Sequence, residues 1–322
     1  MAETLLEIKN LKKHYPIKEK GGLFGKKNFM NAVDNLSLSI DEGQTYGLVG
    51  ESGCGKTTTG RSIVGLEKPD AGEILFHGKN LVCLSDKELK TYRSEIQMVF
   101  QNTLSALNPR MRIGNIFDDV LKINGVANDE ERREKTIDML ERVGLSEAHY
   151  FRFPHELSGG QVQRLGIAIA LIINPRLIVC DEPVSALDMS IQAQILNMLK
   201  ELQQEMNVSL LFISHDISVV RYISHKVGVM YLGSLVEEGP AEEIFKNPLH
   251  PYTKGLLASV PEVGSKRGIK RSMLGEQPVR TDDMVGCPFA SRCPFKKPEC
   301  ETSNPEFKEV SSGHKCACFL CD

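Results

Sequence analysis

The sequence lacks an apolar stretch long enough to cross a membrane. Its longest apolar run extends from Leu165 to Ile173 and ends at Asn174-Pro175, whereas a membrane-spanning helix needs about 20 such residues. The first residues, Met1 to Thr4, also lack the basic start and apolar stretch of a secretory signal. These absences predict a soluble, cytoplasmic polypeptide.

An excess of positive charge is missing as well. The formal net charge of the 322 residues is −3, so the bulk charge gives no sign of a nucleic-acid partner. Hydrophobic residues make up 41% of the chain, which is enough for a core in one large domain or two. The sequence therefore predicts a folded protein that binds no nucleic acid.

Cysteine is scarce along most of the chain and concentrated at its end. Of the nine cysteines, only Cys54, Cys83 and Cys180 lie in the first 286 residues, and six lie in the last 36. In a cytosolic protein, such clustering favours a metal site over disulfides. This change of composition, together with several prolines near residue 250, predicts a domain boundary. We divide the chain into residues 1–246 and 247–322.

A glycine-rich segment predicts a phosphate-binding loop. Residues 50–57 read Gly-Glu-Ser-Gly-Cys-Gly-Lys-Thr and fit the pattern G-x-x-x-x-G-K-S/T. The apolar run Tyr46–Val49 predicts a strand before the loop, and a helix is expected after it. The loop amides and the helix N-terminus would then surround phosphate oxygens. We expect ATP contacts from the following residues: Glu51, Ser52, Gly53, Cys54, Gly55, Lys56, Thr57 and Thr58.

Two carboxylates follow a second apolar run. Leu177–Cys180 predicts a buried strand that ends at Asp181 and Glu182, with Pro183 next in the chain. We expect Lys56 to reach the β- and γ-phosphates and the Thr57 hydroxyl to bind Mg²⁺. Asp181 would hold the same Mg²⁺ through water. Glu182, one step outside the strand, would orient or deprotonate the attacking water.

Four further motifs carry a family resemblance. They are Gln101 after the strand 96–100, the run Leu157-Ser158-Gly159-Gly160-Gln161, the run Ser185-Ala186-Leu187-Asp188, and His215 after the strand 209–213. With the phosphate-binding loop, they make residues from about Leu5 to Lys246 resemble the nucleotide-binding subunits of ATP-binding cassette (ABC) transporters. The resemblance implies a P-loop NTPase (RecA-like) α/β core, a small antiparallel β subdomain, and a helical subdomain over about 102–172.

The resemblance also assigns roles to single residues. Tyr15 would stack on adenine, Gln101 would touch Mg²⁺ and a transmembrane partner, and His215 would sense the γ-phosphate. The alternatives without a functional role are that Tyr15 is an exposed turn residue, that Gln101 is an ordinary strand-end residue and that His215 is a surface histidine. Ser158, Gly159, Gly160 and Gln161 would contact ATP held by another subunit, and Asp188 would belong to a dimer-contact loop. Since each motif occurs once and no internal repeat is present, a second ATPase chain is expected.

The end of the chain resembles the cysteine-rich C-terminal extension of oligopeptide and dipeptide importer ATPases. The matching segments are Asn247–Thr253, Leu256-Leu257 and the cysteine-containing runs after residue 286. This implies a peripheral subunit on the cytoplasmic face of the cell membrane, with two transmembrane permease subunits and an external solute-binding protein as partners. Related importers carry nickel, glutathione or oligosaccharides. A soluble, non-transport ABC ATPase is less favoured, because no coiled-coil insertion or second cassette is present.

The resemblance singles out four of the late cysteines as a candidate metal site and leaves Cys316 and Cys321 as extras. Cys287, Cys293, Cys300 and Cys318 are separated by five, six and seventeen residues, unlike the tight C-x₂-C pairs of most zinc sites. Such a set suits a 4Fe–4S cluster, which the family resemblance suggests. Zinc is the first alternative, and reduced structural thiols are the second. The Lys- and Gly-rich segment Lys18–Lys27 is expected to form a solvated hairpin loop.

Overall fold

The computed structural model describes residues 3–17, 28–259, 278, 280–281 and 284–321. The predicted hairpin loop at Lys18–Lys27 lies outside these residues. Among the described helices, none is long and apolar enough to span a membrane.

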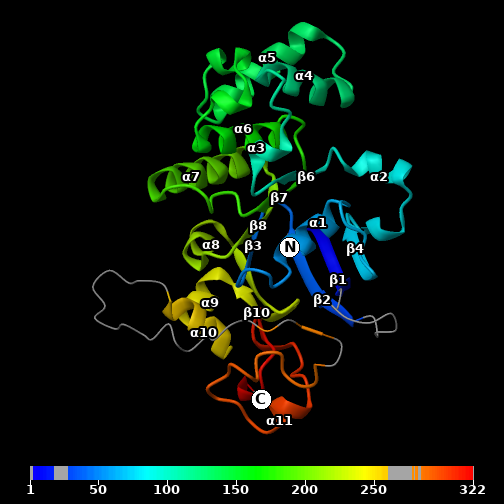
Figure 1. Cartoon of the computed structure of the whole chain (residues 1–322), viewed down its shortest axis with the longest axis vertical. Coiled ribbons are helices and arrows are strands. Elements are labelled where there is room, and N and C mark those ends of the chain that lie inside the picture. Colours follow the sequence, from blue (N-terminus) through cyan, green and yellow to red (C-terminus); the bar gives the residue numbers. More distant parts are fainter. Residues whose placement is uncertain (1–2, 18–27, 260–277, 279, 282–283, 322) are drawn as a thin grey trace.

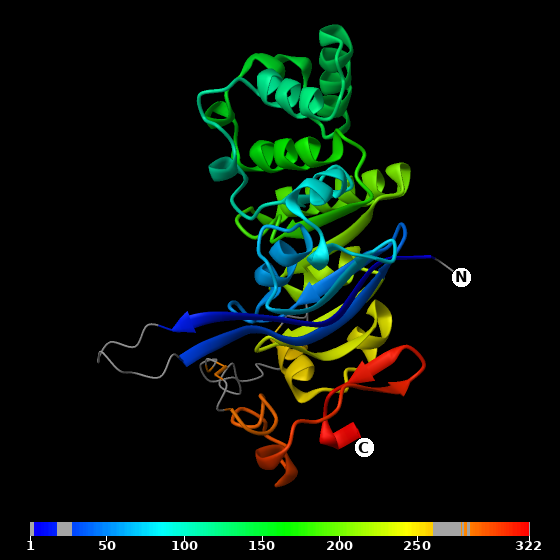
Figure 2. The same ribbon diagram turned by 90° about the vertical axis from the view of Figure 1, so that its right-hand side faces the viewer.

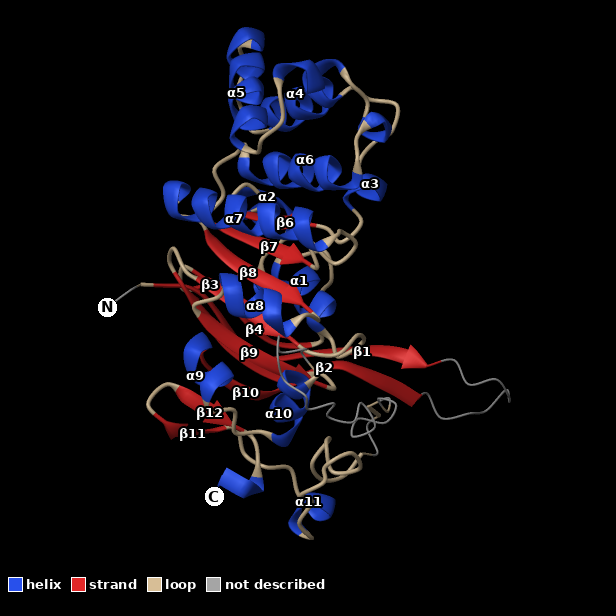
Figure 3. Cartoon of the chain, turned by 90° about the vertical axis from the view of Figure 1, so that its left-hand side faces the viewer, coloured by secondary structure: helices blue, strands red, loops and turns tan. Residues whose placement is uncertain are grey.

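An eight-stranded sheet forms the centre of the molecule (Figures 1 and 3). Strands β9, β3, β8, β7 and β6 are parallel neighbours, and β10, β12 and β11 extend one edge in antiparallel pairing. In sheet order the strands are β11 (Lys308–Ser311), β12 (His314–Cys316), β10 (Ser234–Pro240), β9 (Lys226–Tyr231), β3 (Thr45–Val49), β8 (Ser209–Ser214), β7 (Leu177–Asp181) and β6 (Ile96–Val99). The strands that the sequence predicted at 46–49, 96–100, 177–180 and 209–213 are thus confirmed to within one residue at each end.

Both faces of the parallel strands are buried, as their nearly continuous apolar sequences require. Ile178 and Phe212 face one cluster of buried side chains, which also includes residues of α6 (Gly159–Leu171), α7 (Met189–Met206) and α8 (Ile217–Ile223). Val179 and Leu211 face the other cluster, together with Ile63 of α1 (Lys56–Ile63) and the small sheet. Alternate residues of one strand therefore fill separate cores on opposite faces of the sheet.

The small antiparallel sheet and the helical region match the fold that the resemblance implied. The sheet has the order β2-β1-β4-β5, formed by β1 (Thr4–Ile17), β2 (Asn28–Asp41), β4 (Ala71–Phe76) and β5 (Lys79–Asn80). Helices α4 and α5 lie beyond α6, at the end of the molecule farthest from the C-terminus (Figure 2). The helices of this region are α3 (Thr103–Ala106), α4 (Ile113–Ile123), α5 (Asp129–Arg142) and α6. Helix α2 (Asp86–Tyr92) packs instead beside the small sheet.

The residues after 246 are attached to the same sheet. They include α10 (Pro251–Ala258), α11 (Glu299–Thr302), β11 and β12, and they follow α9 (Ala241–Lys246). The buried carboxylate of Glu237 in β10 accepts hydrogen bonds from the backbone amides of Leu249 and His250, and it lies 2.8 Å from Nε2 of His314 in β12. One carboxylate thus joins two segments of this region to the core. The boundary at 246/247 stays a prediction.

His250 gives this attachment a pH dependence. Its buried ring accepts the N–H of Tyr252 at the start of α10, and burial, followed by the charge of Lys254, lowers the pKa of His250 to about 3. Unfolding restores the ordinary value of about 6.5. Below that pH the unfolded state binds one proton more than the folded state, so the free energy of unfolding falls as the pH falls.

We predict that His250→Asn removes this dependence. Asn keeps an oxygen that can accept the Tyr252 N–H but does not titrate. As the pH falls from about 6.5 to 5, the extra decrease in the free energy of unfolding of the wild type relative to the variant should grow from about 0.7 to about 1.3 kcal/mol per pH unit. Urea unfolding at several pH values measures this difference, and His155→Asn, at an exposed position, is the control. Equal slopes for the wild type and His250→Asn would contradict the prediction.

Candidate functional site

A cavity of about 580 Å³ lies where β3, β6, β7 and β8 end. The loop after β3 forms its floor, and single residues after the other three strands reach it. Binding sites at the carboxyl ends of parallel strands are general in open α/β sheets. The lining residues are Tyr15, Met30, Ala32, Glu51, Ser52, Gly53, Gly55, Lys56, Thr57, Thr58, Gln101, Glu182, His215 and Leu256.

The loop after β3 has the shape that its glycines allow. Gly53 and Gly55 have φ of 80° and 105°, in the region that favours glycine. A Cβ atom at Gly55 would lie 2.0 Å from the carbonyl oxygen of Ala32, so only glycine fits there. The Lys56 ammonium donates to the carbonyl oxygens of Gly50, at 2.7 Å, and Glu51, at 2.9 Å. The Lys56 side chain therefore folds back over the phosphate-binding loop and is bound to its carbonyl oxygens.

Cys54 takes a different position from the other predicted ATP-binding residues. Its side chain is 1% exposed and does not line the cavity, and burial raises the pKa of its thiol. Any contact of Cys54 with a nucleotide would come from its backbone.

Thr57 and Asp181, both predicted to hold Mg²⁺, are in direct contact. The Thr57 hydroxyl donates to Oδ1 of Asp181 at 2.9 Å. Burial raises the pKa of Asp181, and the Thr57 hydrogen bond and the charges of Arg61 and Lys56 act in the opposite direction. A hydroxyl beside a carboxylate is an oxygen pair of the kind that Mg²⁺ prefers. These two residues thus fit the ion, whereas the Gln101 side chain is directed elsewhere.

Glu182 is the point where three predicted catalytic side chains meet. Its Oε2 atom accepts the Gln101 amide at 3.1 Å and lies 3.1 Å from Nδ1 of His215. Glu182 also has a φ of 47°, which is uncommon for a residue other than glycine. Its backbone N–H donates to Ile213 in β8, and its carbonyl accepts from Ser185. These bonds hold the unusual backbone in place, as is frequent at functional sites.

The predicted in-trans residues do not reach the cavity. The Ser158 hydroxyl accepts the Gln161 N–H, and the Gln161 side chain accepts the Ser158 N–H, so this pair caps the start of α6. Asp188 caps α7 by accepting the Ile191 N–H at 2.9 Å. Gly159 lies beside Leu187, in the loop before α7, and Gly160 lies beside Ile191 of α7. Their proposed contact with another subunit stays a prediction.

Several residues at the cavity were missed by the sequence analysis. Met30, Ala32 and Leu256 line it, and Tyr252 and Arg292 hold Glu51 from positions 201 and 241 residues away along the chain. No local motif marks them. Only the folded chain brings them to the phosphate-binding loop.

The four cysteines predicted to bind a cluster do not form a metal-ligand group. Within the described residues, no set of three or more His, Cys, Asp or Glu side chains is arranged to hold a metal ion. Burial raises the pKa of Cys287, and the nearby thiols of Cys300 and Cys293 raise it further. Burial raises the pKa of Cys318 to about 11, with contributions from Cys321, Cys287 and Cys293. Cys287 and Cys318 thus each lie within electrostatic range of other late cysteines, and the backbone N–H of Cys287 donates to the carbonyl oxygen of Cys300 at 2.8 Å.

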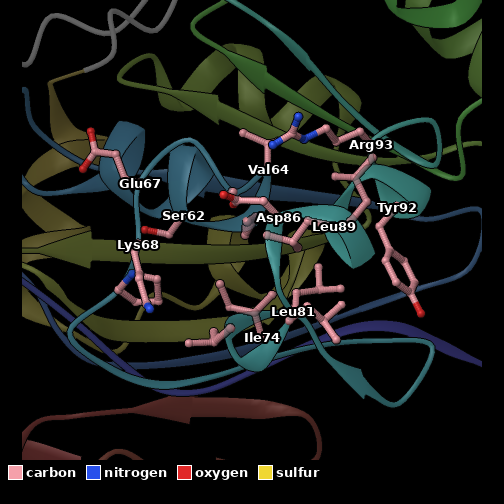
Figure 4. Close-up of a pocket in the computed structure, with 16 residues that line it drawn as sticks. Ser62, Val64, Glu67, Lys68, Ile74, Leu81, Asp86, Leu89, Tyr92 and Arg93 are labelled. Atoms are coloured by element: carbon pink, nitrogen blue, oxygen red, sulfur yellow. The ribbon is translucent and has the colours of Figure 1, made fainter. Parts of the chain in front are cut away.

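A second cavity, of about 160 Å³, lies between α1, β4 and α2 (Figure 4). Ile74, Leu81 and Leu89 gather in it, and the charged side chains of Glu67 and Lys68 lie at one side. The Glu67 carboxylate accepts a hydrogen bond from the hydroxyl of Tyr15, which lines the larger cavity. The smaller cavity does not include the phosphate-binding loop, and its volume is well below that of the larger cavity.

Comparison with known proteins agrees with this geometry. An ABC transporter family model matches residues 33–185, and a model described as the oligopeptide/dipeptide transporter C-terminal region matches residues 236–300. The oligopeptide transport ATP-binding protein AppF of Bacillus subtilis (strain 168) is 49% identical over 99% of this chain and 98% of its own length. The chain belongs to the ABC transporter ATP-binding proteins. The family and fold predicted from the sequence are therefore confirmed.

Other relatives of this ABC ATPase agree. The dipeptide transport ATP-binding protein DppF of Escherichia coli (strain K12) is 43% identical over 100% of this chain and 96% of its own length. A bacterial ABC transporter cassette solved as a dimer has a TM-score of 0.65 and 32% identity, over 74% of this chain and 99% of the cassette. A cassette in a post-hydrolysis state with ADP and phosphate has a TM-score of 0.65 and 31% identity over the same shares. ATP is thus the nucleotide of this family, and the family hydrolyses it.

We predict that Gly53→Ala separates nucleotide binding from stability. Gly53 lines the cavity, and no atom lies within 4 Å of an added Cβ, so the left-handed backbone should cost only about 1–2 kcal/mol of unfolding free energy. The Cβ would occupy space that a phosphate needs, and ATP affinity should fall at least about tenfold.

Gly65→Ala is the matched control, since Gly65 also has positive φ and open surroundings but lies outside the nucleotide cavity. ATP titration and urea unfolding of both variants check the prediction. Equal ATP affinities in the two variants would contradict it.

Proposed function

We propose that this chain is the ATP-hydrolysing subunit of an importer for oligopeptides or dipeptides. It would act on the cytoplasmic face of the cell membrane, with two permease subunits, a second ATPase subunit and an external solute-binding protein. The observation that carries the catalytic part is the meeting of Gln101, Glu182 and His215 beside a phosphate-binding loop. The transport part is supported by the names of the relatives, which are oligopeptide and dipeptide transport ATP-binding proteins.

This proposal assigns a role to several of the side chains at the cavity. The Lys56 ammonium leaves its loop carbonyls for the β- and γ-phosphates, and Tyr15 stacks on adenine. Thr57 would bind Mg²⁺ through its hydroxyl and Asp181 would hold the same ion through water, and the charge of the ion would balance that of the phosphates. Glu182 accepts a proton from the attacking water, so that ATP and water give ADP and phosphate.

A second ATPase chain completes the site. Ser158–Gln161 would meet ATP bound to the facing subunit, where the free N–H groups at the start of α6 can contact phosphate. Asp188 lies in the adjacent loop and would contact the same partner. ATP binding would draw the two chains together, and hydrolysis would let them part. Residues 1–246 would carry this cycle, with 102–172 as the helical subdomain, and residues 247–322 would form the C-terminal domain.

We predict that Glu182→Gln retains ATP binding and abolishes turnover. The amide keeps the shape of the carboxylate but cannot accept the proton, so hydrolysis should fall at least about a hundredfold. With ATP and Mg²⁺ the variant should accumulate as a closed dimer, detected by size-exclusion chromatography.

Glu205→Gln, at an exposed position, is the control and should hydrolyse ATP at the wild-type rate. Near-normal hydrolysis by Glu182→Gln would remove the catalytic assignment. In proteoliposomes with the permeases and the binding protein, ATP-driven uptake of nickel, glutathione or an oligosaccharide in place of peptides would correct the proposed substrate.

We also propose that Cys287, Cys293, Cys300 and Cys318 hold a 4Fe–4S cluster, with zinc as the alternative. The support is the clustering of cysteines in the last 36 residues and the electrostatic influence of other late cysteines on Cys287 and Cys318. Their loops would have to move to bind the cluster, because no ligand group is formed among the described residues. Such a cluster would stabilise a segment that has little core of its own.

Anaerobic purification followed by iron, sulfide and zinc analysis tests this proposal. We expect near four irons and four sulfides per chain, with both lost in Cys293→Ser and retained in Cys83→Ser, an exposed cysteine elsewhere. Stoichiometric zinc would replace the cluster with a metal ion. Absence of both metals would reduce the four residues to structural thiols and leave the ATPase proposal intact.

A further inference from the structure

Arg292, in the cysteine-rich segment, is bound to the phosphate-binding loop. Its guanidinium donates to both carboxylate oxygens of Glu51, at 2.8 Å and 2.9 Å. The Arg292 side chain is only 6% exposed and that of Glu51 is 25% exposed. Two parallel hydrogen bonds between a guanidinium and a carboxylate set both distance and orientation. A residue that lies one position before Cys293 therefore fixes the second residue of the nucleotide loop.

Aromatic side chains pack against this guanidinium. It lies 5.6 Å from the ring centroid of Tyr231 and 6.0 Å from that of Phe289, and it donates to the Tyr231 hydroxyl at 3.3 Å. Tyr231 and Phe289 pack against Tyr252, with ring centroids 4.7 Å and 5.5 Å from the Tyr252 ring. The three rings come from β9, α10 and the cysteine-rich segment, so the Arg292 side chain is confined by well-separated parts of the chain.

Glu51 is consequently held at each of its polar groups. Its backbone N–H donates to the Tyr252 hydroxyl at 2.9 Å, its carboxylate accepts from Arg292, and its carbonyl accepts from the Lys56 ammonium at 2.9 Å. Of these three contacts, two come from residues beyond 246. The C-terminal region therefore takes part in positioning Glu51 within the loop.

The ion pair also has an electrostatic consequence. Glu51 lines the cavity that would hold the phosphates of ATP, and a free carboxylate there would repel them. Arg292 compensates this charge and keeps the carboxylate directed toward the C-terminal segment. Pairs that are shielded from water are screened little by salt, so the compensation should persist at physiological ionic strength.

We propose that Arg292 is a positioning residue for nucleotide binding, acting through Glu51. The cysteine-rich segment would then support the ATP site directly as well as completing the fold. This inference rests on the proposed ATPase function, since it assigns a role in ATP binding.

The test is a double-mutant cycle on the full-length chain with ATP as the probe. Arg292→Met removes the charge and both hydrogen bonds, and ATP affinity should fall at least about tenfold. Arg292→Lys keeps the charge but not the fork and should give an intermediate affinity. In the Glu51→Gln background, Arg292→Met should have little further effect, because no carboxylate remains to be neutralised or held. In the assembled transporter, the KM for ATP should rise while kcat changes little.

Arg280→Met is the matched control. Arg280 also pairs with a carboxylate, that of Asp34, but Asp34 does not line the nucleotide cavity. Urea unfolding of all variants separates affinity from stability. If Arg292→Met does not fold, Arg292→Lys carries the test, and only a raised KM with little change in kcat supports the proposal.

Four results would overturn the proposal. They are a folded Arg292→Met or Arg292→Lys variant with wild-type affinity, equal effects of Arg292→Met and Arg280→Met, additive effects of Arg292→Met and Glu51→Gln, or a loss confined to kcat. Failure of the underlying ATPase function would look different, because the wild type and Lys56→Ala would then bind ATP equally.

Discussion

The parallel pairing of β3, β8 and β7 is the constraint on which the nucleotide site depends. Since these strands run in the same direction, the phosphate-binding loop, Glu182 and His215 leave the sheet at one edge. Reversing β7 alone would carry Glu182 to the opposite edge, about 17 Å away for a five-residue strand. The two buried clusters on either face of the sheet stabilise this register, because a shift by one residue would exchange the side chains between them. The packing of the two buried clusters therefore fixes the positions of the residues in the nucleotide site.

The sequence was most informative where function and local structure share one short segment. The phosphate-binding loop and the pair Asp181-Glu182 each follow a short apolar run whose length and flanking residues favour a buried strand. Glycines in the sequence indicate the backbone conformation of the loop, and charged residues at the end of a predicted strand indicate the catalytic groups. The order of these motifs then indicated the family, and the family indicated the small sheet and the helical region.

The remainder depends on contacts that no local pattern encodes. Leu256 reaches the nucleotide cavity because α10 packs across the end of the sheet, and Arg292 reaches Glu51 because an aromatic cluster receives it. In sequence, both residues belong to a region that reads as a separate domain. The arrangement of the four cysteines was equally inaccessible, since spacing along the chain does not determine how loops approach one another. Roles that need a second subunit, such as that of Ser158, stay predictions for the same reason.

The contacts of Glu182 also link hydrolysis to the surroundings of the site. One carboxylate oxygen is engaged by both Gln101 and His215, and a carboxylate can still accept a proton at its other oxygen. The two neighbours therefore orient the proposed base without blocking it. Because these neighbours are the residues expected to respond to the membrane partner and to the γ-phosphate, a movement of either one would turn the carboxylate and change how well it is placed for the attacking water.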